Sequence, residues 1–300
     1  MRQGWLCKAG ALEISAEWRI NVMSLFSGLD KLGLGKLEKM DVFEGEDKKE
    51  TADGKPAEPK VTEADLLFDK SYTCPVCDTE FHSKMVRTGK VKLLSADTDL
   101  RPKYQLVDSL KYDAIVCPKC GYGALSRFFK YMMPAQAELI RENISKNFSG
   151  LKETGDTYTY DDAIMRHQLA LANTVVKKAK ASEKAYTCMK MAWLCRGKAE
   201  SLPKDTPDYD EQIKALHKEE TELLANAYNG FMEAFSKESF PMCGMDEITV
   251  TYLIADLARR TGKYEESSRW ISRVLTSRDA NERIKNKARD IKELLNAQKA

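Results

Sequence analysis

Two pairs of cysteines, each with two residues between its members, constrain the fold of this chain more than any other feature. Cys74 and Cys77 form the first pair, and Cys117 and Cys120 form the second. Each spacing lets one tight turn direct two sulfurs at the same point. The proline after the first cysteine of each pair fixes φ, and Gly121 supplies the left-handed conformation that closes the second turn. We therefore predict that Cys74, Cys77, Cys117 and Cys120 together hold one structural Zn²⁺.

Other readings of these thiols are weaker. A redox pair needs a βαβ context and a helix N-terminus that lowers a thiol pKa, and neither pair has them. His82 follows Cys77 by five residues and could replace a cysteine ligand, but four thiols already complete the set. Four cysteine ligands leave no open position for water, so we predict no catalysis at the metal. The 39 residues between the pairs can form the hairpins of a zinc ribbon, with a strand expected over residues 112–116.

Composition places the chain among globular proteins. Its 300 residues correspond to about two domains, and 43% of them are hydrophobic. A net charge of +2 gives no bulk attraction to nucleic acid or anionic lipid. Residues 20–29, the longest charge-free apolar stretch near the start, are too short for a membrane helix, which needs ~20 residues. Glu13 and Glu17 precede this stretch and no clear cleavage site follows it, so we expect a cytoplasmic protein rather than a secreted one.

Residues 1–70 are predicted to be a disordered tail and an acidic linker. Residues 41–65 hold nine acids against four lysines and few large apolar side chains, which is too little apolar surface to offset the entropy of ordering. Leu25, Leu29 and Leu32 share one helical face, so the alternative is a short motif that folds on a partner. We also expect translation to start at Met23, which leaves residues 1–22 untranslated.

The chain from residue 131 onward is predicted to be helical. Apolar residues recur at three- and four-residue spacing over 208–237, as on one face of a long amphipathic helix. They are Ile213, Leu216, Leu223, Ala227, Tyr228, Phe231 and Phe235. Further helices are expected at 134–148, 161–180, 182–199, 245–260, 264–276 and 281–297. The cysteines at 188 and 195 share a face among methionines, and we interpret them as small buried hydrophobes.

One pair of these helices is similar to a tetratricopeptide repeat. Ala255 and Ser267 are small residues that allow close helix approach, and Gly262 is placed to end the first helix in a left-handed cap. The pair departs from the repeat pattern at Thr251 and Ala258, where larger aromatic residues are usual. A degenerate repeat bundle and a generic helical bundle therefore both stay open.

The remaining candidate catalytic or cation-binding residues lie between Asp97 and Pro102. Asp97 and Asp99 would share a face of a strand and could act as an acid/base pair or bind a cation. A turn held by side-chain hydrogen bonds and a salt bridge to Arg101 is the commoner arrangement. We find no serine–histidine–aspartate signature and no phosphate-binding glycine loop. An enzyme that uses Asp97 and Asp99 is accordingly the remotest of our hypotheses.

A nucleic-acid-binding ribbon is a nearer alternative. Residues 71–130 hold ten basic side chains against six acids, a weak excess for a nucleic-acid binder. Lys84, Arg87, Lys90 and Lys92 are clustered with few aromatic residues between them, which is more typical of a solvated hairpin face than of a nucleic-acid-binding surface.

Several motifs in combination point to a known family. They are Y-T-C-P-V-C, S-A-D-T-D-L-R-P-x-Y, C-P-K-C-G-Y, A-W-L-C-R and Y-L-I-A-D-L-A-R-R-T-G-K-Y-E-E-S. Over about residues 66–300 the chain resembles the bacterial domain-of-unknown-function family 2225. The resemblance implies a zinc-ribbon-like module followed by a repeat-like helical region, with the four cysteines as ligands, and it implies no reaction. It also makes Asp97, Asp99 and Arg101 candidates for a family-specific surface.

The sequence thus predicts an α+β protein that is mostly α. A disordered tail (1–70) precedes a small β-rich zinc-ribbon-like module (71–130), and a tetratricopeptide-like helical bundle (131–300) follows. We hypothesise a non-catalytic zinc-binding scaffold or adaptor that binds a protein or peptide through its helical domain and has no membrane span. Its cellular role, its partner and its oligomeric state are left open.

Overall fold

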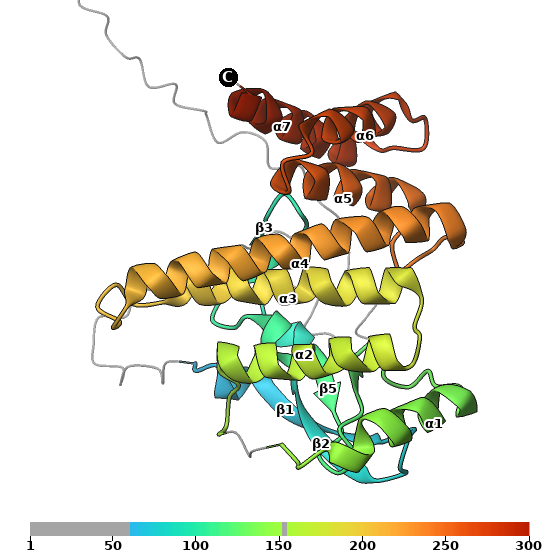
Figure 1. Cartoon of the computed structure of the whole chain (residues 1–300). Helices are drawn as coiled ribbons and strands as arrows, with labels where there is room; N and C mark the ends of the chain where they lie inside the picture. Colours follow the sequence, from blue (N-terminus) through green and yellow to red (C-terminus); the bar gives the residue numbers. More distant parts are fainter. Residues whose placement is uncertain (1–60, 152–154, 300) are drawn as a thin grey trace, which may run out of the picture. The chain divides into compact units, whose positions relative to one another are not determined.

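Three short antiparallel hairpins precede seven α-helices in residues 61–151 and 155–299, the parts of the chain that our computed structural model describes. The predicted class, mostly helical with small sheets before a helical bundle, is confirmed (Figure 1). The expectations for residues 1–60, including the start at Met23 and the motif around Leu25, lie outside the described residues. The residues from 61 onward belong to one compact unit.

The three hairpins are short, and each forms its own two-stranded sheet. Strand β1 (Leu67–Thr73) pairs with β2 (Glu80–Val86), β3 (Leu93–Ala96) with β4 (Pro102–Tyr104), and β5 (Ala114–Val116) with β6 (Gly123–Leu125). The strand expected over residues 112–116 is therefore present but starts two residues later. Tyr112 instead ends a 3₁₀ turn and stacks on Tyr158, with ring centroids 5.1 Å apart.

The start of the first hairpin corrects the expected end of the tail. Residues 64–66 form a 3₁₀ turn and β1 begins at Leu67, so structure begins before residue 71. Leu66 and Leu67 are buried and pack in a cluster with Val107 and Tyr112. The acidic composition of the preceding residues led to an expected tail that included this apolar pair. The burial of the pair stabilises the first strand.

The helices follow the predicted ranges closely. They are α1 (Pro134–Asn143), α2 (Tyr160–Val176), α3 (Ala181–Ser201), α4 (Tyr209–Lys237), α5 (Glu247–Arg260), α6 (Tyr264–Thr276) and α7 (Glu282–Lys299). Helix α1 ends earlier than expected, because a separate 3₁₀ turn covers Ser145–Asn147. None of the described helices is long and apolar enough to cross a bilayer.

Helices α3 and α4 run side by side along their length (Figure 1). The apolar face predicted for α4 is confirmed, since Leu223, Ala227 and Phe231 are all buried. A side chain built on Gly230 would lie 2.8 Å from Cβ of Ala185. The two helices thus approach closely where both carry small residues.

The close approach predicted between α5 and α6 is also confirmed. The Ser267 hydroxyl donates to the carbonyl of Ala255 at 2.8 Å, and both residues are buried. Gly262 has φ = 77° and ends α5 as expected. The assignment of this pair to a tetratricopeptide repeat stays a prediction.

Helix α2 joins the hairpins to the bundle. Ala170 packs against Ala114 and Leu125, one from each strand of the third hairpin. A side chain built on Gly123 would lie 3.3 Å from the backbone nitrogen of Ala170. This contact fixes the third hairpin, and with it the second cysteine pair, against the helices.

Candidate metal centre

The first cysteine pair lies in the turn between β1 and β2, which we call the first knuckle (residues 74–79). The Cys74 amide donates to the Thr79 carbonyl at 3.0 Å, and the Asp78 amide donates to the Cys74 carbonyl at 2.9 Å. Asp78 has φ = 56°, a left-handed conformation that aspartate tolerates better than most residues. The turn therefore closes without a glycine.

The second pair lies in the turn between β5 and β6, the second knuckle (residues 117–122), and repeats the same geometry. The Cys117 amide donates to the Tyr122 carbonyl at 2.8 Å, and the Gly121 amide donates to the Cys117 carbonyl at 3.1 Å. Gly121 has φ = 72°, so the left-handed role predicted for it is confirmed. Each knuckle presents two sulfurs from one side of its turn.

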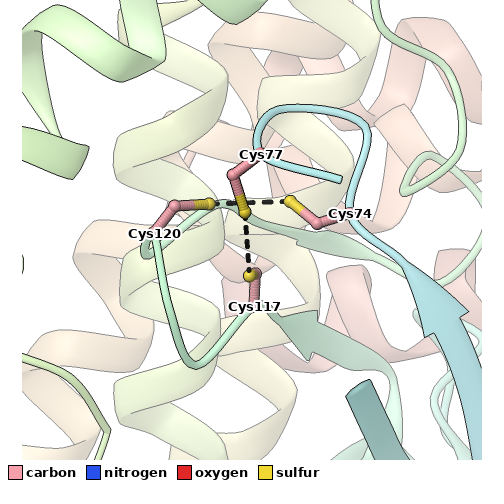
Figure 2. Close-up of side chains that lie close together, drawn as sticks. All are labelled: Cys74, Cys77, Cys117 and Cys120. Carbon is pink, nitrogen blue, oxygen red and sulfur yellow. Dashed lines mark hydrogen bonds between the residues drawn. The ribbon is translucent and has the colours of Figure 1, made fainter. Parts of the chain in front are cut away.

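The two knuckles face each other, and their four sulfurs converge on one point (Figure 2). All four Sγ atoms lie within 4.8 Å of one another. The Cys74–Cys120 sulfurs are 3.5 Å apart and the Cys77–Cys117 sulfurs 3.7 Å apart. A tetrahedral S₄ site with metal–sulfur bonds of ~2.3 Å has sulfur–sulfur edges of about 3.8 Å. The cluster therefore has the dimensions that hold one tetrahedral metal ion.

The surroundings of the cluster favour a thiolate at one of its four sulfurs. Cys74 and Cys117 are fully buried, and only Cys77 is partly exposed. Hydrogen bonds from Cys120 and Cys74 hold the pKa of Cys117 far below its usual value, whereas the hydrogen bonds to Cys117 raise the pKa of Cys74 and raise that of Cys120 to about 12. The thiolate is the form that ligates metal. Tyr72, Phe81, Tyr122 and Phe129 surround the cysteines in one apolar cluster that keeps water away from the sulfurs.

One side chain from α1 and one from α2 donate hydrogen bonds to the knuckles. Neither of them was identified from the sequence. Arg141 of α1 donates from Nε to the carbonyl of Val76 at 3.0 Å. Asn173 of α2, which is fully buried, donates from Nδ2 to the carbonyl of Gly121 at 3.0 Å. Each knuckle is therefore held by one helix, and these outer contacts orient the sulfurs.

Replacing Gly121 with alanine should destabilise the protein by about 3 kcal/mol. The left-handed conformation costs an L-residue about 1–2 kcal/mol, and the added Cβ would lie 2.6 Å from Cγ of Phe148, which adds packing strain. Urea denaturation of the variant measures the effect. Gly89→Ala is the matched control, because a Cβ at Gly89 meets nothing within 4 Å. An equal, small loss in both variants would contradict this account.

The other candidate ligands lie elsewhere. His82 is exposed on β2, where Nε2 lies 3.1 Å from the Ser71 hydroxyl, and it is outside the sulfur cluster. Cys188 and Cys195 are buried in the helical core as expected. Burial raises the pKa of Cys188 to about 11 and that of Cys195 to about 12, so both behave as inert apolar groups.

Part of the basic cluster on the first hairpin has intramolecular partners. Lys84 pairs with Asp69 at 3.7 Å on the neighbouring strand. Arg87 donates from Nε to the carbonyl of Leu67 at 3.0 Å. These contacts fit the reading of this face as a solvated hairpin.

The tip of the β3–β4 hairpin carries Asp97, Asp99 and Arg101, and it enters the helical bundle. Figure 1 shows this hairpin extending past α3 and α4 toward α5. The expected turn and salt bridge are present: the Leu100 amide donates to the Asp97 carbonyl at 3.0 Å, and Arg101 pairs with the Asp97 carboxylate at 3.7 Å. Asp99 and Arg101 are almost completely buried, so they do not form the exposed surface that the resemblance made a candidate.

Asp99 is the centre of a buried ion-pair network. Arg196 of α3 donates to both of its carboxylate oxygens, at 3.1 and 2.7 Å, and the Trp193 indole donates at 2.9 Å. Arg196 also donates from Nε to Glu220 of α4 at 2.7 Å. Burial acts to raise the pKa of Asp99, but Arg196, with help from Arg260, outweighs it and holds that pKa below its ordinary value. The carboxylate is thus a charged structural group with both oxygens engaged.

Helix α5 completes the network. The Thr98 hydroxyl donates to Asp256 at 2.7 Å, and Asp256 in turn pairs with Arg259 and Arg260 at 2.8 and 2.9 Å. The Tyr252 hydroxyl donates to the Thr98 carbonyl at 2.5 Å. The segment between the two cysteine pairs is therefore fastened to α3 and α5 by charge-assisted hydrogen bonds, and Arg196 links this network to α4.

His167 of α2 gives a pH dependence that is separate from the cysteines. Complete burial lowers its pKa to about 4, with Lys190 and Arg166 acting in the same direction and Asp113 opposing them. Because the folded pKa lies below the unfolded value of 6.5, stability is lost as pH falls from 6.5 toward 4. We expect a loss of about 2 kcal/mol between pH 7 and pH 5.

Urea denaturation at both pH values measures this loss, and His167→Leu is the reference variant. The variant should lack the His167 contribution while keeping any acid sensitivity of the cysteines. Equal pH dependence of the two proteins would contradict the assignment.

Comparison with known proteins assigns most of the described region to a family. The model of a family described as an uncharacterized protein conserved in bacteria, DUF2225, matches residues 67–295. The chain belongs to this family. The resemblance inferred from the sequence motifs is thereby confirmed. Both knuckles of the DUF2225 protein and the seven helices of its described residues begin within the matched range. No curated protein and no solved structure matches the chain.

Proposed function

We propose that this DUF2225 protein is a non-catalytic zinc-binding scaffold whose helical domain binds a protein or peptide in the cytoplasm. The observation that carries the proposal is the set of four sulfurs at the spacing of a tetrahedral site. An all-cysteine set favours zinc over harder cations. It leaves no coordination position for a substrate, which is the arrangement of structural zinc sites. Reduced thiols fit a cytoplasmic location.

The contacts between the knuckles and the helices support a scaffold role. Arg141 and Asn173 tie one helix to each knuckle. The ion pairs around Asp99 tie the intervening segment to the bundle. One metal ion that fixes both knuckles would therefore also fix the relative positions of α1, α2 and α3. A rigid helical surface of this kind loses little entropy when it binds a partner.

Affinity purification of the full chain from its native cells tests the proposal. We expect about one zinc ion per chain and a stoichiometric protein partner that survives nuclease treatment. We also expect the partner to be lost when a strong chelator removes the metal. A chain that retains its partner and its fold without metal would overturn the scaffold role.

A further inference from the structure

A cleft with a volume of about 980 Å³ lies where three connections meet. Its lining comes from the segment between β6 and α1, from the α2–α3 connection, and from the α4–α5 connection. The last two lie at the same end of the bundle (Figure 1). The cleft is distinct from the metal centre, because none of the four cysteines lines it.

One wall of the cleft is apolar and exposed. Tyr131 has 76% of its surface exposed and Met133 has 61%, and both line the cleft with Phe128 and Met132. Pro241, from the α4–α5 connection, also lines the cleft. Methionine side chains are flexible and polarizable, so a wall of this kind adapts to apolar side chains of a bound chain. Exposed apolar side chains that gather in a concavity are typical of binding sites.

The charges in the cleft leave an excess of cations. The two lining carboxylates are already engaged: Glu183 pairs with the buried Lys177 at 2.7 Å, and Glu238 accepts from the Ser182 amide at 3.0 Å. The cations Arg127, Lys178 and Lys180 are exposed and line the same cleft. Within residues 61–151 and 155–299 these three form no ion pair.

Arg127 is held in place without an ion pair to any described residue. Its guanidinium lies 5.1 Å from the ring centroid of Tyr186 and packs over Gly244, where a built Cβ would be 2.8 Å from Nη1. The cation is thus oriented by an aromatic face and by a glycine that leaves room for it. Among the described residues no acceptor engages its guanidinium, so its hydrogen-bonding edge can take a carboxylate.

We propose that this cleft binds an acidic peptide segment of a partner protein, with carboxylates on Arg127, Lys178 and Lys180 and an apolar side chain against Tyr131 and Met133. The inference rests on the proposed function and adds the surface and the chemistry of the partner. A nucleic acid fits less well. The cleft offers one largely exposed aromatic ring rather than the series of stacking surfaces that single-stranded nucleic acids use.

Fluorescence anisotropy of the full chain tests this surface. The probe is a short fluorescein-labelled peptide of glutamates interspersed with leucine and phenylalanine. Its charge-reversed lysine counterpart and a short oligothymidylate are the comparison ligands. We expect the acidic peptide alone to bind, and the double variant Lys178→Glu/Lys180→Glu to weaken binding by at least about tenfold. The pair Tyr131→Ala/Met133→Ser should weaken it similarly, and both pairs are exposed, so the fold is retained.

The matched control is Lys214→Glu/Lys218→Glu, which reverses two exposed charges on α4 outside the cleft and should change affinity by less than about twofold. Three results would overturn the inference: preference for the oligonucleotide, equal binding by the cleft variants, or an affinity for the acidic peptide weaker than about 1 mM. Zinc content, measured on every variant, separates the two proposals. A zinc-loaded chain that fails these tests refutes the cleft alone, whereas a chain without zinc refutes the scaffold.

Discussion

Replacing Cys117 with serine is expected to abolish stoichiometric zinc binding and to unfold the two knuckles. Cys117 is fully buried, and its Sγ lies 3.7 Å from that of Cys77. A serine hydroxyl does not ionise at neutral pH and cannot replace the thiolate. A structural zinc contributes on the order of 10 kcal/mol to the folding of small modules, which is comparable with the whole stability of a domain. The loss should therefore exceed that of any single change in the helical core.

Elemental analysis and thermal unfolding measure the two effects. The zinc content should fall from about one ion per chain to a small fraction of that, and the unfolding midpoint should drop steeply. Cys243→Ser is the matched control, because Cys243 is half-buried and its thiol donates to the carbonyl of Ser182 outside the cluster. This control should keep its zinc. If the Cys117 variant kept full zinc occupancy, the four-sulfur site would be wrong.

The second large effect is expected from Arg196→Met, which should destabilise the protein by about 3–5 kcal/mol. Arg196 is the counterion of Asp99 and Glu220, and it also contacts Asp97 at 3.0 Å. Removing Arg196 leaves the buried Asp99 carboxylate with only Arg260 at 3.5 Å and the Trp193 indole as partners, and the loss of a buried counterion is strongly destabilising. Because this network fastens the β3–β4 hairpin to the helices, we also expect faster amide hydrogen exchange in that hairpin.

The cost of Arg196→Met should shrink at acid pH. In the wild type the pKa of Asp99 is depressed, so its stabilising charge is present above the ordinary value of 3.8 and is lost only below it. Without Arg196, only Arg260 and the Trp193 indole oppose the effect of burial, so the pKa of Asp99 rises. The variant then gains a proton, and recovers stability, as pH falls from 7. Urea denaturation of the wild type and of Arg196→Met at two pH values should show a smaller difference in unfolding free energy at the lower pH.

An exposed pair of the same chemistry is the control for this network. Arg273 pairs with Glu247 at 2.8 Å, with about half of each side chain exposed. Arg273→Met should cost less than about 1 kcal/mol, because water already solvates both groups. A similar cost for the two arginine variants would show that the Asp99 network does not hold the hairpin.

Local patterns were enough to predict the helices and the cysteine cluster. The three- and four-residue periodicity of α4 identifies its buried face directly, and Gly262 marks the end of α5. The two knuckles follow from cysteine spacing alone, because each turn is a local structure. These elements depend on residues that are close together in the chain, so the sequence alone is enough to predict them.

The long-range contacts were not predictable in the same way. Asp99 and Arg196 are distant in sequence, and nothing in either local pattern names the other as a partner. The signal that was available is Asp256, a charged residue inside the buried apolar run of α5. A buried charge requires a partner, so Asp256 already indicated an ion-pair network. Arg141 and Asn173 are also distant in sequence from the knuckles that they contact. No local sequence pattern therefore predicts these two hydrogen bonds.

X-ray absorption at the zinc edge of the purified, reduced full chain tests the central claim most directly. Four convergent thiolates predict a single shell of four sulfur neighbours at ~2.3 Å with about one zinc ion per chain. A shell that mixes sulfur with nitrogen or oxygen, or a reduced chain that carries no stoichiometric metal, would contradict it.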